Sequence, residues 1–221
     1  MRDPYDRNSK WLIGHQGGAV LRLGGAQGFT AWRAVQAELV VPKKLPDGLL
    51  EVEYPGKDEP DLYLVEITTY PDRDVERQAV EDALIVFLDR RRLPEILILV
   101  LCPRGQLRVA DRRDMGSTHG WTQLGVRWRV VELWTLPAVD LLAANDVGLI
   151  PWVPLMQFDG PPEAMLRECR DRIERQAPPE QRETMKVVAA MLGALRYDEA
   201  MLQAIFGEVH RVCSNSLSWT A

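Results

Sequence analysis

The feature that most constrains the fold is an order of strand, helix and strand in the middle of the chain. Residues 62–68 are dense in β-branched and aromatic side chains, which predicts a strand. Apolar residues at helical spacing predict an amphipathic helix over residues 73–91. A continuous apolar run at 96–101, bounded by prolines, predicts a strand buried on both faces. A helix between two such strands implies a parallel crossover, so we expect an α/β fold.

The rest of the chain divides into a strand-rich half and a helical half. We expect further strands at 32–41, 49–54, 106–110 and 126–133. A proline-broken connector at 148–154 precedes expected helices at 163–176 and 180–195. The sequence therefore predicts an α/β core over residues 1–147 and a helical appendage over residues 148–221, with a disordered tail after residue 207.

Hydropathy and the N-terminal residues predict a cytoplasmic protein without a membrane partner. No run approaches the roughly 18 apolar residues that a membrane helix needs. The first six residues carry two acids and a proline, where a secretory signal would place a cationic segment. The cysteines are widely separated and are expected to be reduced thiols: Cys102, Cys169 and Cys213. The scattered histidines make a histidine-based metal site improbable: His15, His119 and His210.

The net charge of −5 argues against a protein that coats nucleic acid through bulk electrostatics. It does not exclude an enzyme that acts on nucleic acid, because a site that cuts phosphodiesters concentrates carboxylates around metal. Such an enzyme needs only a local cationic groove. Lys43 and Lys44, together with arginines between Arg73 and Arg113, could supply that groove, although a solvated charged face is the simpler interpretation of each one alone.

Glu66 is the first candidate for a functional side chain. Alternation along the strand places Glu66 on the same face as Leu62 and Leu64, with Thr68 beyond it. A carboxylate flanked by so much apolar surface is costly unless it binds a cation, pairs with a base or lies where the strand reaches solvent. The pattern alone leaves these three outcomes open.

Asp47 is the second candidate, although an Asp before a Gly is also an ordinary turn pair. If the strands at 49–54 and 62–68 pair in an antiparallel hairpin, the start of one lies beside the end of the other. Asp47 and Glu66 would then converge. Two convergent carboxylates with room for water are a common way to hold Mg²⁺, which can activate a water and stabilise charge on a phosphorus centre.

The residues around these two acids also resemble a known family. The matching segments are 46–50 (PDGLL), 66–72 (EITTYPD), Gln78 and 93–95 (LPE), followed by 128–134, 148–154 and 195–197. In this order they resemble the Rpn-like proteins, bacterial recombination-promoting nucleases also labelled transposase-like, within the PD-(D/E)XK nuclease superfamily. The resemblance spans roughly residues 30–207. It implies a restriction-endonuclease-like fold, with a mixed sheet flanked by helices.

The resemblance further implies a metal-dependent DNA endonuclease that uses Mg²⁺ or Mn²⁺ held by Asp47 and Glu66, with Glu38 as a weak accessory. Thr68 is the main departure, because the superfamily pattern places a lysine two residues after the glutamate, and threonine carries no charge. Gln78 is the natural replacement, with Arg73 and Arg77 as cationic alternatives, and an ordinary helical glutamine is as well supported. DNA is the implied partner, and a homodimer stays open.

Three hypotheses therefore follow from the sequence. The first is an active Mg²⁺-dependent nuclease with Asp47, Glu66, Thr68 and Gln78 in its site. The second is a catalytically inactive relative that keeps the fold and acts as a DNA-binding or protein-interaction module, which Thr68 and the acidic charge favour. The third is an unrelated α/β structural protein, which a large distance between Asp47 and Glu66 would favour.

Overall fold

A computed structural model describes residues 30–31, 46–56, 58–144 and 146–207 of the chain. The described residues from Pro46 to Gly207 belong to one compact unit. Several predictions fall outside the described residues: the strand at 32–41, Glu38, Lys43, Lys44, His15, His210, Cys213 and the tail after residue 207.

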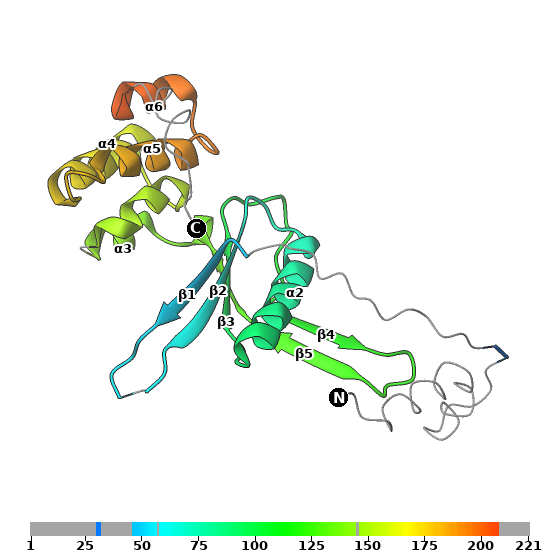
Figure 1. Cartoon of the computed structure of the whole chain (residues 1–221). Helices are drawn as coiled ribbons and strands as arrows, with labels where there is room; N and C mark the ends of the chain where they lie inside the picture. The colour runs from blue at the N-terminus through cyan, green and yellow to red at the C-terminus, as the bar shows by residue number, and fades with distance from the viewer. Residues whose placement is uncertain (1–29, 32–45, 57, 145, 208–221) are drawn as a thin grey trace. The chain divides into compact units, whose positions relative to one another are not determined.

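The centre of this unit is a mixed sheet of four strands (Figure 1). Strands β1 (Gly48–Val52) and β2 (Asp61–Thr68) are antiparallel neighbours. Strands β3 (Glu95–Val100) and β6 (Arg129–Glu132) continue the sheet in parallel, in the order β1-β2-β3-β6. Helix α2 (Arg73–Arg90) connects β2 to β3, which is the crossover that two parallel neighbours require. The predicted strands at 49–54, 62–68 and 96–101 and the helix at 73–91 are thus confirmed.

Helix α2 begins and ends where local chemistry dictates. The side chain of Asp72 accepts a hydrogen bond from the backbone N–H of Asp74 at 2.9 Å, which caps the first turn. Arg90 lies in the last turn, where a cation suits the negative end of the helix dipole. The helix stops at Arg91, whose φ of 58° is left-handed, and Pro94 lies shortly beyond. These signals fix the position of α2 along the sheet.

One face of the sheet packs beneath α2. We call the resulting core the sheet cluster: Leu62, Leu64, Val75, Ala79, Val80, Ala83, Val86, Ile96, Ile98, Val100, Val109 and Trp128. On the opposite face, Val65, Leu97 and Leu99 are half-buried and Ile67 is exposed. The prediction that the run at 96–101 is buried on both faces is therefore wrong for one of them. A continuous apolar run in the sequence does not show whether each face of the strand is fully or only partly buried.

The strands predicted after β3 need correction. Residues 106–110 form no strand, because they pair with no neighbouring strand. A separate two-stranded hairpin follows instead, with β4 (Arg112–Gly116) antiparallel to β5 (Gln123–Arg127). The strand predicted at 126–133 is divided at Trp128, which lies between β5 and β6. The Trp128 backbone N–H donates to the Asp111 carbonyl at 3.0 Å. This backbone group therefore bonds beside the hairpin and not within the four-stranded sheet.

The second half of the chain is helical. Its elements are η1 (Leu133–Thr135), α3 (Ala138–Ala143), η2 (Val147–Leu155), α4 (Pro162–Gln176), α5 (Arg182–Gly193) and α6 (Glu199–Phe206). The helices predicted at 163–176 and 180–195 are confirmed, and the proline-broken connector forms η2. The buried residues here, with Leu101 and Cys102 from the end of β3, form what we call the helical cluster. The division of the chain at residue 147 stays a prediction.

Arginines close the ends of these helices. Four of them donate to carbonyl oxygens at helix C-terminal ends: Arg172 to Leu142, Arg196 to Met156, Arg182 to Ala177 and Arg170 to Ile205. Carbonyls in the last turn of a helix lack an intrahelical donor, so these bonds satisfy groups that would otherwise need water. Among the described residues, no helix combines the length and the apolar character needed to cross a membrane.

Candidate functional site

The pairing of β1 with β2 brings Asp47 to the level of Glu66. The ladder joins Gly48 to Val65, and Asp47 and Glu66 are the next residues outward in the two strands. Oδ2 of Asp47 accepts a hydrogen bond from the backbone N–H of Ile67 at 2.8 Å. Asp47 is exposed, so its carboxylate lies at the edge of the sheet with access to solvent. The antiparallel hairpin on which the convergence of these acids depended is confirmed.

Glu66 lies on the buried face of β2, as the alternation predicted. Its exposed fraction is 1%, and its neighbours on that face are Leu64 and, in the register of β3, Ile98, both fully buried. Oε2 of Glu66 accepts a hydrogen bond from Nε2 of Gln78 at 2.8 Å. Of the three outcomes that the pattern left open, exposure to solvent is therefore excluded. Burial among leucine and isoleucine disfavours the charged form unless polar groups stabilise it.

Gln78 reaches Glu66 because α2 lies across β2 and β3. It follows Val75 by three residues and precedes Asp82 by four, and both of those side chains are buried against the sheet. Residues at these spacings share one face of a helix. The structure thus brings together Glu66 and Gln78, two residues that the sequence had joined only through a family resemblance.

Asp82 is a residue that the sequence reasoning missed. Its exposed fraction is 2%, and with Glu66 it is one of two buried charged residues in the described part of the chain. The signal was present in the sequence: Asp82 follows Gln78 by one helical turn and lies between the apolar residues Ala79 and Val86 on the packed face of α2. An acid on that face, like Glu66 on the face of β2, breaks the apolar pattern.

Thr68 occupies the position expected for a lysine but is engaged with the backbone. Its Oγ1 donates a hydrogen bond to the carbonyl oxygen of Tyr70 at 2.8 Å. The hydroxyl therefore supports the turn after β2 and brings no positive charge to Glu66. The structure gives Thr68 a structural contact, and its predicted catalytic role stays a prediction.

The cationic alternatives are not brought to Glu66. Nη1 of Arg77 lies 2.8 Å from Oε1 of Glu81, and Nη2 lies 3.7 Å from Oδ1 of Asp74, all on the exposed side of α2. The hydrogen bond and charge of Glu81, reinforced by Asp74, raise the pKa of Arg77. Arg73, the first residue of α2, is exposed. Gln78 is thus the predicted partner that the structure places on Glu66.

The donor set suits a hard divalent cation with few protein ligands. In the described residues, no group of three or more His, Cys, Asp or Glu side chains is placed to hold a metal ion. Asp47 and Glu66 offer carboxylate oxygens from neighbouring strands, one exposed and one buried. Mg²⁺ keeps several waters and is often held by only one or two carboxylates, so these two residues fit it by chemistry. They do not fit zinc, which takes four ligands in structural sites.

Both cysteines of the helical cluster have raised pKa values. Burial raises the pKa of Cys169 to about 12, and the charge of Glu168 adds to the rise. Burial also raises the pKa of Cys102, which Arg196 partly opposes. Both cysteines are free and buried, in agreement with the expected reduced thiols.

Comparison of the chain with protein-family models, with curated proteins and with solved structures finds no match. What the chain itself defines is an α/β protein with a mixed sheet flanked by helices.

Proposed function

We propose that this chain is a metal-dependent DNA endonuclease of the PD-(D/E)XK type, related to the Rpn-like proteins. The observation that carries the proposal is the placement of Asp47 beside Glu66 where the β1–β2 ladder ends, with Gln78 bonded to Glu66 at 2.8 Å. The order of β1, β2, α2 and β3 is compatible with that fold. DNA is the proposed substrate.

In this proposal Asp47 and Glu66 hold Mg²⁺ or Mn²⁺. When bound, the ion would supply an activated water and stabilisation of the charge that develops on the phosphate. The Ile67 N–H fixes one oxygen of Asp47, and the Gln78 amide fixes one oxygen of Glu66. Gln78 is a positioning residue here, because its amide donates to a carboxylate of the chain and adds no charge.

Nicking of supercoiled plasmid by the purified full chain tests the proposal. We expect nicking with Mg²⁺ or Mn²⁺ and none with EDTA. Asp47→Asn and Glu66→Gln preserve side-chain shape but weaken cation binding, so we expect each to lower the rate about a hundredfold or more. Asp159→Asn, at an exposed position in the loop before α4, is the matched control and should nick at the wild-type rate.

Two results would overturn the proposal. One is a wild-type protein that does not nick supercoiled or single-stranded DNA with either cation. The other is nicking that Asp47→Asn and Glu66→Gln leave unchanged, because the activity would then belong to another site or to a contaminant.

A catalytically inactive relative with the same fold is the second candidate. Two observations favour it. The Thr68 hydroxyl donates a hydrogen bond to the Tyr70 carbonyl, and the described residues provide no cluster of three metal ligands. Calorimetry separates the two candidates. Binding of Mn²⁺ that Asp47→Ala abolishes supports the nuclease, whereas a wild-type protein that binds DNA without binding either cation supports the inactive relative.

A further inference from the structure

The segment after β3, which contains the hairpin of β4 and β5, carries a charge opposite to that of the chain as a whole. We call residues 103–129 the arginine arm. It contains two aspartates, Asp111 and Asp114, and six arginines: Arg104, Arg108, Arg112, Arg113, Arg127 and Arg129. The full chain has a net charge of −5, so this segment has a net charge of the opposite sign. A local excess of this kind attracts polyanions even on an acidic protein.

The two strands of the arm place arginines against each other. Arg112 and Arg127 are directly opposite in the antiparallel ladder, where like charges destabilise the pair. Asp114 relieves one of them, with its Oδ2 at 2.5 Å from Nε of Arg112. Arg127 forms no ion pair within the described part of the chain.

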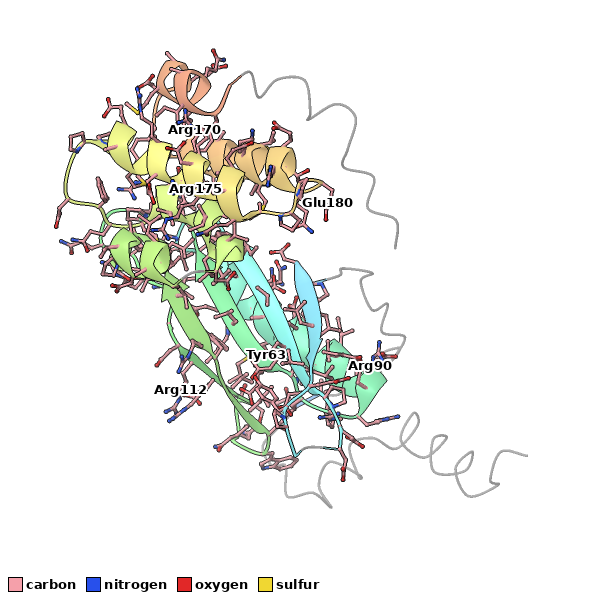
Figure 2. All side chains as sticks on the ribbon, turned by 90° about the vertical axis from the view of Figure 1, so that its left-hand side faces the viewer. Tyr63, Arg90, Arg112, Arg170, Arg175 and Glu180 are labelled. Carbon is pink, nitrogen blue, oxygen red and sulfur yellow. The ribbon has the colours of Figure 1, made fainter. Side chains whose placement is uncertain are left out.

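Both faces of the arm carry a cation. Arg112 and Arg127 share one face, and Arg113, opposite Val126, lies on the other. The residues of β4 and β5 are exposed, except Arg113 and Val126, which are half-buried. Arg112 extends outward from the ribbon (Figure 2). The hairpin is thus a two-stranded ribbon with a cation on each face, and Arg113 is half-buried on the face where Val126 packs against the sheet cluster.

The tip of the arm presents an aromatic side chain. Trp121 is 60% exposed. The turn that carries it is closed by hydrogen bonds from the Ser117 N–H to the Thr122 carbonyl at 2.9 Å and from the Thr122 N–H to Ser117 Oγ at 3.0 Å. Gly120 takes a φ of 72°, which favours glycine. An ordered turn therefore holds a large apolar ring that is mostly exposed to water.

The root of the arm is anchored to the helix that carries Gln78. Nε1 of Trp128 donates to the Ala110 carbonyl at 2.6 Å, and Val109 and Trp128 are buried in the sheet cluster. The Ala110 N–H donates to Oε1 of Glu76, on α2, at 3.1 Å. Glu76 and Gln78 lie within the first two turns of α2. The arm is thus joined to the element that positions Glu66.

We propose that the arginine arm binds duplex DNA by lying in the major groove. The choice of DNA rests on the proposed function, and the choice of the duplex rests on shape. The major groove of B-DNA admits a two-stranded β-ribbon, with phosphates on both sides. In this proposal Arg127 and Arg113 contact phosphates that border the groove, and Trp121, at the tip, contacts the bases.

The test measures binding without cleavage. Fluorescence anisotropy of a labelled 20-base-pair duplex (a length of about two helical turns) is followed in EDTA at several salt concentrations. Each phosphate contact contributes close to one unit to the slope of log Kd against log salt concentration. We expect Arg127→Gln and Arg113→Gln each to reduce that slope by about one unit. Arg167→Gln, an equal charge change at an exposed position in α4, should leave it unchanged.

Two further comparisons address the groove. Trp121→Ala should weaken binding about tenfold, and Phe158→Ala, which removes another exposed aromatic ring, should not. Duplex RNA of the same sequence should bind more weakly than the DNA, because the major groove of A-form RNA is deep and too narrow for the ribbon. Equal affinity for the two duplexes, or tighter binding of single-stranded DNA, would overturn insertion into the groove.

The result separates this inference from the proposed function. Arm variants that bind DNA with the wild-type affinity and salt slope refute the arm, even if the wild type nicks plasmid. Loss of binding in the arm variants supports the arm even if the wild type nicks nothing with Mn²⁺, since EDTA removes the metal from the binding assay.

Discussion

The sheet cluster and the helical cluster both bury apolar side chains, but they treat charge differently. Within the described residues, the two buried acids belong to β2 and α2: Glu66 and Asp82. The helical cluster buries only apolar residues and cysteines. Its charged groups lie at the rim, where four arginines bond to the carbonyls at helix ends.

This difference indicates which region is organised for stability. Burying a carboxylate costs free energy even when it is hydrogen-bonded, whereas an arginine at a helix end satisfies a carbonyl and stays partly hydrated. The helical cluster therefore has the arrangement expected of a region that stabilises the fold. The sheet cluster accepts a cost, which is common where side chains are kept for chemistry.

The largest effect is expected from a cavity in the helical cluster. Leu166 is fully buried in α4, so Leu166→Ala should lower the free energy of unfolding by about 3–5 kcal/mol. Leu166→Met, which conserves volume, should lower it by less than about 1.5 kcal/mol. Urea denaturation measures both. Similar values for the two variants would show that this cluster is not closely packed.

A smaller effect is expected from the titration of Cys169. Its pKa is about 12 in the folded protein and 9.0 without burial, so the unfolded chain loses the proton first. Well below pH 9, ionisation of the thiol does not change the free energy of unfolding. As pH rises from 9 to 10.5, it should lower the free energy of unfolding by about 1.5 kcal/mol. Urea denaturation at several pH values should show a flatter dependence for Cys169→Ala, and an unchanged slope would contradict the burial of the thiol.

The arginines at the rim should contribute less. Arg172 donates Nη1 to the Leu142 carbonyl and Nε to Glu168 at 2.6 Å. Arg172→Met keeps the apolar stem and removes these bonds, so we expect a loss of about 1 kcal/mol. Arg167→Met, at an exposed position in the same helix, should change stability by less than about 0.5 kcal/mol. Thermal unfolding of the two variants makes the comparison.

The smallest change in stability is expected at Glu66. Glu66→Gln replaces the buried carboxyl group by an amide of the same shape and keeps an oxygen that can accept from Gln78, so the free energy of unfolding at pH 7 should stay within about 1 kcal/mol of the wild type. Chemical denaturation without added cations is the measurement. A loss of 3 kcal/mol or more would mean that the carboxylate stabilises the fold, and the contrast between the two clusters would no longer hold.

The elements that the sequence predicted are those with a strong local signal. Strand β2 is rich in β-branched and aromatic residues, and α2 has an apolar period with a capping acid at Asp72. The alternation in β2 also predicted which side of the strand Glu66 would occupy. Pairing of β1 with β2 followed from a short connection between two strands, and it placed Asp47 correctly at the level of Glu66.

Elements without such a signal were missed. Residues 106–110 alternate apolar and polar side chains as a strand does, yet Leu107 is exposed and no strand pairs with them. The hairpin of β4 and β5 consists largely of charged residues and glycines, which have low strand propensity, so pairing between the strands decides its structure. Asp82 was overlooked because a single acid in an amphipathic helix is normally assigned to the solvent face.

Helix α2 bonds at one position to the root of the arm, through Glu76, and at another to Glu66, through Gln78. If a ligand at one end of this helix alters affinity at the other end, the reverse effect is equal by thermodynamic reciprocity. Tighter binding of a divalent cation in the presence of a DNA duplex would thus require tighter binding of the duplex in the presence of the cation, by the same factor.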